Sequence, residues 1–154
     1  MIEIPNFKTL DIQHILCDYN GTIAKDGMVL PEIKALFERL SKVYTLHVIT
    51  ADTFGSVHTQ LEGYDVNIKV LSTDYHTEEK AAYVTQLGKD TCVAIGNGNN
   101  DAAMLSLASI GIAVMGDEGC AKDALMGSDV ICKNIDEAFS LIIQSKRLIA
   151  TLRR

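Results

Sequence analysis

Short apolar runs alternate along this chain with segments whose apolar positions recur at helical spacing. Runs of this length, bounded by polar or turn residues, are typical of buried strands. Because strands and helices alternate, the pattern predicts an α/β fold with a doubly wound parallel sheet, covered by helices on both faces in three layers. The predicted strands are residues 12–17, 44–49, 66–71, 92–95, 110–114 and 130–132.

Start signals accompany most of the helical segments. Pro31 precedes the first segment, and proline is favoured where a helix begins. Thr53 and Thr77 precede or open two later segments, and Asn134 or Asp136 opens the last, as side chains able to cap a first turn. The predicted helices are residues 33–40, 57–61, 77–87, 102–107 and a terminal helix from 134 or 136 to 148.

A single carboxylate follows the first of these strands. Asp18 comes directly after the apolar residues 15–17, and Gly21 then supplies the backbone freedom for a sharp turn. The carboxyl end of a parallel strand faces the usual ligand crevice, so we expect Asp18 to project into a site. The alternative is a plain turn, because Asn-Gly and Asp are common turn formers.

A second polar cluster, Gly96-Asn97-Gly98-Asn99-Asn100-Asp101, follows the strand at residues 92–95. Between the two clusters lie Thr50, at the end of an apolar run, and Lys80, within a helical segment. Taken singly, such a threonine is more often a turn residue and such a lysine a solvated charge. The order of Thr50 and Lys80 along the chain, between two polar clusters at strand ends, favours a shared site at one edge of the sheet.

At these residues the chain resembles the haloacid dehalogenase superfamily of aspartate-nucleophile phosphotransferases. The family's motifs are matched in order by Asp18 to Thr22, by Thr50, by Lys80 and by Gly96 to Asp101. The resemblance covers nearly the whole chain and implies a Rossmann-like core. The last motif, followed by Ala-Ala-Met-Leu, looks most like the phosphorylation domain of P-type ATPases and its soluble relatives.

The resemblance implies a role for each matched residue. Asp18 would attack phosphorus and form an aspartyl phosphate, while the Thr50 hydroxyl donates to a phosphate oxygen and Lys80 neutralises charge. Gly21 and Asn100 would help to hold the phosphate. The family's Mg²⁺ would be bound by Asp18, the backbone carbonyl of Asn20, Asn97 and Asp101.

Two positions depart from the family pattern by losing a carboxylate. Asn20 stands where most family phosphatases have an acid/base Asp, and Asn97 stands where they have the first metal-binding Asp of the last motif. Asn20 cannot exchange a proton near neutral pH, and such help is worth ~10²–10⁴-fold in rate. We therefore expect slow hydrolysis that favours acyl or aryl phosphates, together with weakened metal binding.

The intervals between the motifs are too short for an inserted cap domain. Between Asp18 and Thr50 we expect only one helix, one strand and a flap hairpin at residues 22–30 that turns at Gly27. The chain is thus interpreted as a single capless domain, residues 1–154. An open site suggests a phosphorylated small molecule or macromolecule as substrate, or closure by a neighbouring subunit in a homo-oligomer. Ion pumping is excluded.

Three hypotheses about function remain. The first is a Mg²⁺-dependent phosphohydrolase acting on phosphomonoesters or acyl phosphates through phospho-Asp18. The second is a regulatory or binding protein with little turnover, which the neutral Asn20 and Asn97 favour. The third is a carbon–halogen hydrolase, which the metal-type loop ending in Asp101 disfavours.

Composition limits the partners. The net charge of −6 argues against nucleic acid and anionic membranes, and no apolar run approaches the ~20 residues of a transmembrane helix. With no signal-peptide pattern, we expect a cytoplasmic protein. The four cysteines lack metal-ligand spacing, and we expect neither disulfides nor zinc. The four histidines are scattered; His58 and His76 could approach the site, although spacing alone does not place them there.

Overall fold

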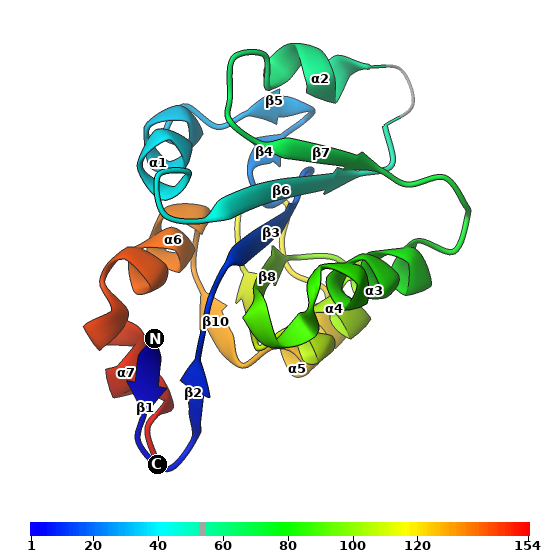
Figure 1. Cartoon of the computed structure of the whole chain (residues 1–154). Helices are drawn as coiled ribbons and strands as arrows, with labels where there is room; N and C mark the ends of the chain where they lie inside the picture. The colour runs from blue at the N-terminus through cyan, green and yellow to red at the C-terminus, as the bar shows by residue number, and fades with distance from the viewer. Residues whose placement is uncertain (53–54) are drawn as a thin grey trace.

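A six-stranded parallel sheet forms the centre of the molecule (Figure 1). The computed structural model describes residues 1–52 and 55–154. The strand order is β10-β9-β8-β3-β6-β7, so β3 lies in the interior of the sheet, paired with β8 and β6. The strand bounds are β3 His14–Asp18, β6 Thr45–Thr50, β7 Asn67–Val70, β8 Cys92–Gly96, β9 Ile110–Val114 and β10 Val130–Cys132. All six predicted strands are thereby confirmed, with ends shifted by one or two residues.

Helices cover both faces of this sheet. Successive residues of a strand point to opposite faces, so neighbouring residues pack into different cores. Ile15 and Cys17 pack into one hydrophobic core with residues of α1, α2, α6 and α7, whereas Leu16 packs into a second core with α3, α4 and α5. The predicted three-layer, doubly wound α/β fold is confirmed. The helix bounds are α1 Ile33–Leu40, α2 Ser56–Gln60, α3 His76–Leu87, α4 Ala102–Leu107, α5 Lys122–Gly127, α6 Ile135–Ile143 and α7 Ser145–Leu152.

Four features differ from the sequence prediction. A hairpin of β1 (Ile2–Ile4) and β2 (Lys8–Leu10) precedes the central sheet, α5 adds a helix, and two short 3-10 turns, η1 (Lys89–Thr91) and η2 (Asn99–Asp101), flank β8. The predicted terminal helix is interrupted at Gln144, whose φ of −108° and ψ of 70° are not helical, so α6 and α7 are separate helices. Thr53, expected just before α2, lies outside the described residues.

The flap hairpin directly follows the candidate nucleophile. It consists of β4 (Ala24–Lys25) and β5 (Met28–Val29), joined by a turn in which Asp26 and Gly27 both have positive φ. The hydroxyl of Tyr19 donates to the carbonyl of Gly27 at 2.8 Å and ties the hairpin tip to the end of β3. In the described part of the chain, the intervals between the motifs hold only this flap, α1, α2, α3, η1 and sheet strands, so no cap domain covers the site. None of the helices within residues 1–52 and 55–154 is long and apolar enough to cross a membrane.

Candidate active site

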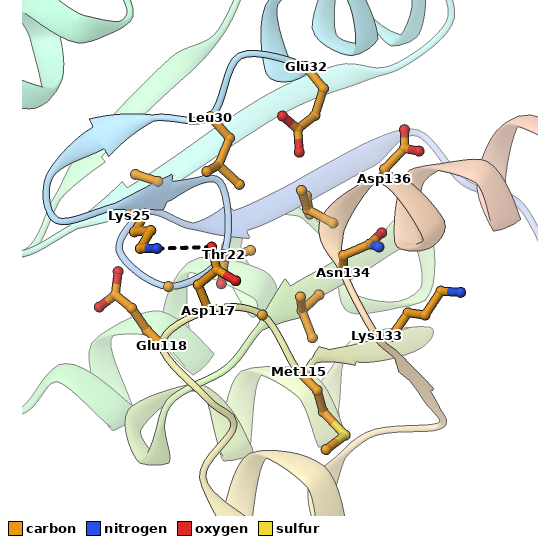
Figure 2. A pocket seen from close by; sticks show the side chains of 15 residues that line it. Thr22, Lys25, Leu30, Glu32, Met115, Asp117, Glu118, Lys133, Asn134 and Asp136 are labelled. Atoms are coloured by element: carbon orange, nitrogen blue, oxygen red, sulfur yellow. Dashed lines mark ion pairs between the residues drawn. The ribbon is translucent and has the colours of Figure 1, made fainter.

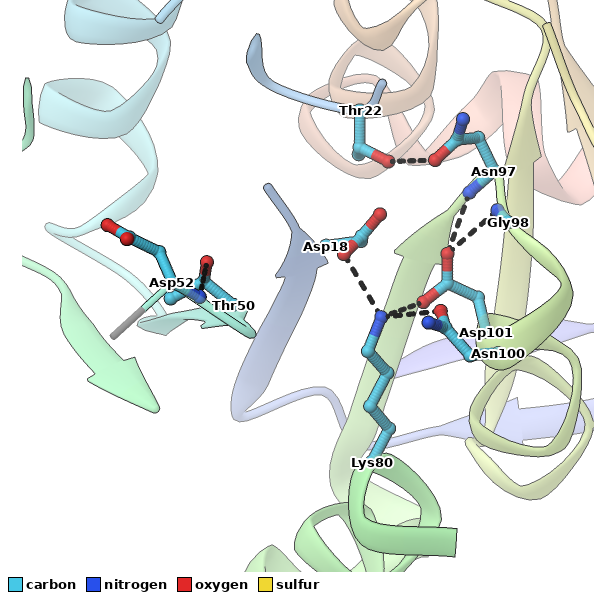
Figure 3. Close-up of polar contacts among 9 residues, drawn as sticks. All are labelled: Asp18, Thr22, Thr50, Asp52, Lys80, Asn97, Gly98, Asn100 and Asp101. Atoms are coloured by element: carbon cyan, nitrogen blue, oxygen red, sulfur yellow. Dashed lines mark hydrogen bonds and ion pairs between the residues drawn. The ribbon is translucent and has the colours of Figure 1, made fainter. Parts of the chain in front are cut away.

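The predicted site residues meet at the carboxyl edge of the sheet. Asp18 is the last residue of β3, Thr50 ends β6 and Gly96 ends β8. Because these three strands are parallel neighbours, the side chains and loops at their ends converge (Figure 3). The adjacent loop after β8 carries Asn97, Asn100 and Asp101 to the same place.

A cavity of about 280 Å³ lies at this edge. Most of the predicted site residues line it, but Gly21 and Asp101 do not: Gly21 lines a neighbouring cavity, and Asp101 is fully buried behind the wall. The wall is made by Asp18, Tyr19, Asn20, Thr50, Ala51, Leu71, His76, Lys80, Asn97, Gly98 and Asn100.

Lys80 is the centre of the polar network. Its ammonium group donates to Oδ1 of Asp18 at 3.0 Å, to Oδ1 of Asn100 at 2.8 Å and to Oδ1 of Asp101 at 2.8 Å (Figure 3). Lys80 is only 2% exposed, and a buried ammonium is tolerated when carboxylates surround it. Burial by itself lowers the pKa of Lys80, but Asp18 and Asp101 outweigh it and raise the pKa above its usual value. Lys80 therefore stays charged.

Asp101 holds the loop and the lysine in place. Its Oδ1 accepts from Lys80, and its Oδ2 accepts from the backbone N–H groups of Asn97 at 3.0 Å and Gly98 at 2.9 Å. A Cβ at Gly96 would overlap this carboxyl group, so the strand end needs a glycine there. Both oxygens of Asp101 are engaged, and its predicted role as a metal ligand would require one of these bonds to give way.

Asn97 connects the site to the flap. Its side chain lies against Gly21, which has a φ of 80° and no room for a Cβ. The amide nitrogen of Asn97 donates to the carbonyl of Gly119 at 3.1 Å, and its Oδ1 accepts from the hydroxyl of Thr22 at 3.4 Å. The amide thus joins the residues after the nucleophile to the turn after β9, and its oxygen remains a neutral donor for a cation.

Asp18 and Thr50 present reactive groups to the cavity. Burial, together with the charge of Asp101, raises the pKa of Asp18 to about 7, although Lys80 opposes both. Lys80 contacts one oxygen of Asp18, and the other oxygen points away from the lysine (Figure 3). Thr50 is buried, and its hydroxyl accepts from the backbone N–H of Asp52 at 3.0 Å, which leaves the hydroxyl proton for another acceptor.

The donors around Asp18 are consistent with a magnesium ion. Asp18, the backbone carbonyl of Asn20 and the amide oxygen of Asn97 are hard oxygen donors beside one cavity. Among the described residues, no three His, Cys, Asp or Glu side chains cluster as a metal site. Mg²⁺ commonly uses one or two carboxylates and fills its other positions with water and substrate phosphate. The residues fit such an ion with a single anionic protein ligand.

Five residues of the cavity wall were not assigned to the site from the sequence. His76 lines the wall together with Asp18 and Asn20. A lone histidine carries no motif, so only its spacing of four residues from Lys80 on α3 could have placed it on the same helix face. The other wall residues missed, Tyr19, Ala51, Leu71 and Gly98, follow from their positions at or near strand ends.

A second, larger cavity of about 520 Å³ lies on the other side of Gly21 and Thr22 (Figure 2). Its walls come from the flap, from residues 115–118 after β9 and from the start of α6, and it shares no lining residue with the first cavity. Lys25 of the flap forms an ion pair with Asp117 across it, at 3.3 Å. Acidic side chains, among them Glu32 and Asp136, dominate its rim.

Sequence comparison connects the chain to one group of enzymes. Residues 75–126, which contain Lys80 and the loop up to Asp101, match the family model described as haloacid dehalogenase-like hydrolase. An uncharacterised protein of Methanocaldococcus jannaschii is 46% identical over 61 residues, a match that covers 40% of this chain and 66% of that protein.

Solved structures share the fold over most of the chain. The 3-deoxy-D-manno-octulosonate 8-phosphate phosphatase of Moraxella catarrhalis, in complex with magnesium, phosphate and its sugar acid, has a TM-score of 0.72 at 18% identity and covers 93% of this chain and 94% of its own. The cobalt-bound phosphatase of the same name from Haemophilus influenzae has a TM-score of 0.72 at 11% identity, with 89% and 90% covered. At these identities the likeness establishes the fold.

Proposed function

We propose that this chain, a haloacid dehalogenase-like protein by its fold and its last motif, is a Mg²⁺-dependent phosphohydrolase that works through an aspartyl phosphate on Asp18. One observation carries the proposal. The buried ammonium group of Lys80 donates a hydrogen bond to one oxygen of Asp18 at 3.0 Å. The second oxygen of Asp18 is not held by the lysine, and Asp18 lines the cavity. That arrangement suits a carboxylate that attacks phosphorus while its charge is balanced.

The residues divide the work of phosphoryl transfer among them. Asp18 attacks phosphorus in line with the leaving oxygen, and Lys80 offsets the negative charge shared by the carboxylate and the phosphoryl group. The Thr50 hydroxyl and the amide of Asn100 are placed at the cavity wall to donate to phosphoryl oxygens. Water then attacks the aspartyl phosphate and frees Asp18. Mg²⁺, held by Asp18, the Asn20 carbonyl and Asn97, supplies charge neutralisation when bound.

The substrate class follows from what the site lacks. Asn20 cannot protonate a leaving oxygen, which disfavours alkyl phosphates unless another residue does so. Phosphorylated small molecules fit a cavity of about 280 Å³, and the solved relatives named above act on a sugar-acid phosphate. The absence of a cap domain leaves room for a phosphorylated macromolecule, or for a second copy of the chain that closes the site.

A regulatory or binding role is the second candidate, and the charge of the site favours it. Asn20 and Asn97 are both neutral where the resemblance implies carboxylates. A protein of this kind would bind phosphate or metal with little turnover. The intact contacts between Lys80, Asp18 and Asp101 favour catalysis instead, because a site used only for binding does not need a buried nucleophile.

Phosphate release tests the proposal directly. An acyl phosphate and an aryl phosphate would be incubated with the natural protein and with Asp18→Asn, each with Mg²⁺ and with a chelator. We expect release that needs both the metal and Asp18, since the amide of asparagine is not a nucleophile here. Release that persists in Asp18→Asn would contradict phosphoaspartate chemistry, and no release by either protein would support the binding role.

A further inference from the structure

We infer that His76 is the proton donor and acceptor of this site, in the role that Asn20 cannot fill. The inference rests on the proposed phosphohydrolase function and adds a catalytic residue to it. It is carried by the position of His76 in the wall of the cavity that holds Asp18, and by the fact that every other titratable side chain there is already committed.

The position of His76 on α3 directs it toward the reaction. His76 is the first residue of the helix, and Lys80 follows one turn later on the same face. Helical side chains lean toward the N-terminus, so Lys80 reaches back to Asp18, and both Lys80 and His76 line the cavity. His76 is partly buried, which suits a group that must contact both substrate and water.

The other titratable groups of this cavity are engaged. Asp18 is the nucleophile, and Lys80 donates to three oxygens. The hydroxyl of Tyr19 is directed to the flap carbonyl of Gly27 and away from the cavity. Within residues 1–52 and 55–154, the imidazole of His76 forms neither a hydrogen bond nor an ion pair. It is the one uncommitted titratable side chain of this wall.

The backbone before His76 is nevertheless held firmly. The carboxylate of Glu79 accepts from the backbone N–H groups of Ser72, at 2.9 and 3.0 Å, and of Thr73, at 2.9 Å. The N–H of Tyr75 donates to the hydroxyl of Thr73 at 3.1 Å. The loop is therefore fixed up to the residue before His76, while the imidazole itself is left without a structural partner. A fixed backbone with a free ring is what proton transfer to a bound substrate requires.

The proposed steps balance in protons and bonds. As Asp18 attacks, the bond between phosphorus and the leaving oxygen breaks, and imidazolium His76 gives its proton to that oxygen. Neutral His76 then takes a proton from the water that attacks the aspartyl phosphate. The bond between phosphorus and Asp18 breaks, the carboxylate is restored and His76 is again protonated. Imidazole can perform both transfers near neutral pH.

A series of leaving groups separates this role from simple phosphate binding. The natural protein and His76→Gln would be assayed with Mg²⁺ on p-nitrophenyl phosphate, whose leaving group needs no proton, and on glycerol phosphate, whose alkoxide does. We expect His76→Gln to lower kcat/KM, which reports the steps up to departure of the leaving group, by ~10²-fold on glycerol phosphate and by less than about threefold on p-nitrophenyl phosphate. An equal loss of kcat/KM on both substrates, or no loss, would overturn the inference.

Two further variants complete the test. His58→Gln changes an exposed histidine outside the cavity and should match the natural protein on both substrates. Adding Asn20→Asp to His76→Gln should restore most of the glycerol phosphate activity, because it returns a proton donor to the cavity wall. If the natural protein released no phosphate from p-nitrophenyl phosphate, the proposed function itself would fall, and the inference with it; activity without the leaving-group effect would sink only the inference.

Discussion

The ammonium nitrogen of Lys80 lies 2.8 Å from Oδ1 of Asp101, and the other oxygen of the same carboxylate caps the loop after β8. One fully buried carboxylate thus fixes both the lysine that holds the nucleophile and the backbone around Asn97. Breaking a buried ion pair of this kind leaves the buried ammonium charge of Lys80 only partly neutralised, which strongly destabilises the folded state.

Asp101→Asn should therefore reduce both stability and activity. We expect a loss of at least about 3 kcal/mol in the free energy of unfolding, measured by urea denaturation. Asp117→Asn is the matched control, because Asp117 and its partner Lys25 form an exposed pair that contributes less than about 1 kcal/mol. Similar losses in the two variants would contradict the structural role given to Asp101.

Gly21 and Gly27 allow backbone strain to be separated from crowding. Both have φ near 80°, but a Cβ at Gly21 would overlap Asn97, whereas one at Gly27 would meet no atom within 4 Å. Gly27→Ala should cost roughly 1 kcal/mol from backbone strain alone. Gly21→Ala should cost several times more and displace Asn97, so that Mg²⁺-dependent activity falls as well. Equal costs in urea denaturation would show that the contact with Asn97 is unimportant.

Two buried groups should change the stability of the fold in opposite directions on mild acidification: Asp18, whose pKa is raised to about 7, adds stability, and His47 removes it. His47 is 3% exposed and lies between His14, at 3.0 Å, and the hydroxyl of Tyr83, at 2.8 Å. Burial, with the nearby His14, lowers the pKa of His47 from 6.5 to about 4. The unfolded chain therefore binds the proton first. The contribution of His47 is full above pH 6.5 and is lost as the pH falls toward 4, by roughly 2 kcal/mol at pH 5.

Urea denaturation at pH 7.5 and pH 5 checks this expectation. In His47→Gln, which has no proton to bind, the difference between the two values should shift by roughly 2 kcal/mol in the acid-stabilising direction, even if that variant is less stable overall. His58→Gln should keep the full difference, since His58 is exposed. An unchanged difference in His47→Gln would assign the acid sensitivity to other groups.

Glu79 should govern the order of the segment before α3. The hydrogen bond from the backbone N–H of Ser72, and to a lesser extent that from Thr73, lowers the pKa of Glu79 to about 2, although desolvation acts in the opposite direction. Its stabilising effect is thus present above pH 4.5 and lost as the pH falls toward 2. In Glu79→Ala we expect faster amide hydrogen exchange at residues 72–75 and weaker activity. Glu78→Ala removes a neighbouring exposed carboxylate and should leave exchange unchanged.

Asn97→Asp should strengthen metal binding. The substitution places a second carboxylate beside Asp18 in exchange for the bond from the Asn97 amide to Gly119. We expect the Kd for Mg²⁺, measured by titration calorimetry, to fall by about tenfold or more, because hard cations favour anionic oxygen ligands. Unchanged affinity would show that position 97 does not contact the ion.

Much of the sheet and the convergence of the site could be predicted from the sequence. Apolar runs identify strands such as β3 and β8 because these are buried on both faces, and parallel strand ends must share an edge. The hairpin of β1 and β2 was missed because each strand has only three residues and too little pattern. The interruption at Gln144 was missed because apolar helical spacing continues through it.

The hydrogen bonds and packing of individual side chains could not be predicted from such patterns. Nothing in the loop sequence shows that both oxygens of Asp101 are engaged, or that Asn97 packs on Gly21, because these depend on rotamers set by neighbours far along the chain. His76 has no motif and is located only by the path of α3. The Mg²⁺ site, the placement near soluble P-type ATPase relatives, oligomer formation and the cytoplasmic location stay predictions.

The neutral side chains at positions 20 and 97 also change what an arriving anion meets. With Asp18, Asp101 and Lys80 as its charged groups, the pocket carries about one net negative charge, where two further aspartates would make it three. Each unit of like charge removed at ~5 Å spares a phosphate roughly 3 kcal/mol of repulsion per unit of its own charge. Inorganic phosphate therefore meets less repulsion in this pocket before any cation arrives, and the protein should retain its product longer than a variant with aspartate at both positions.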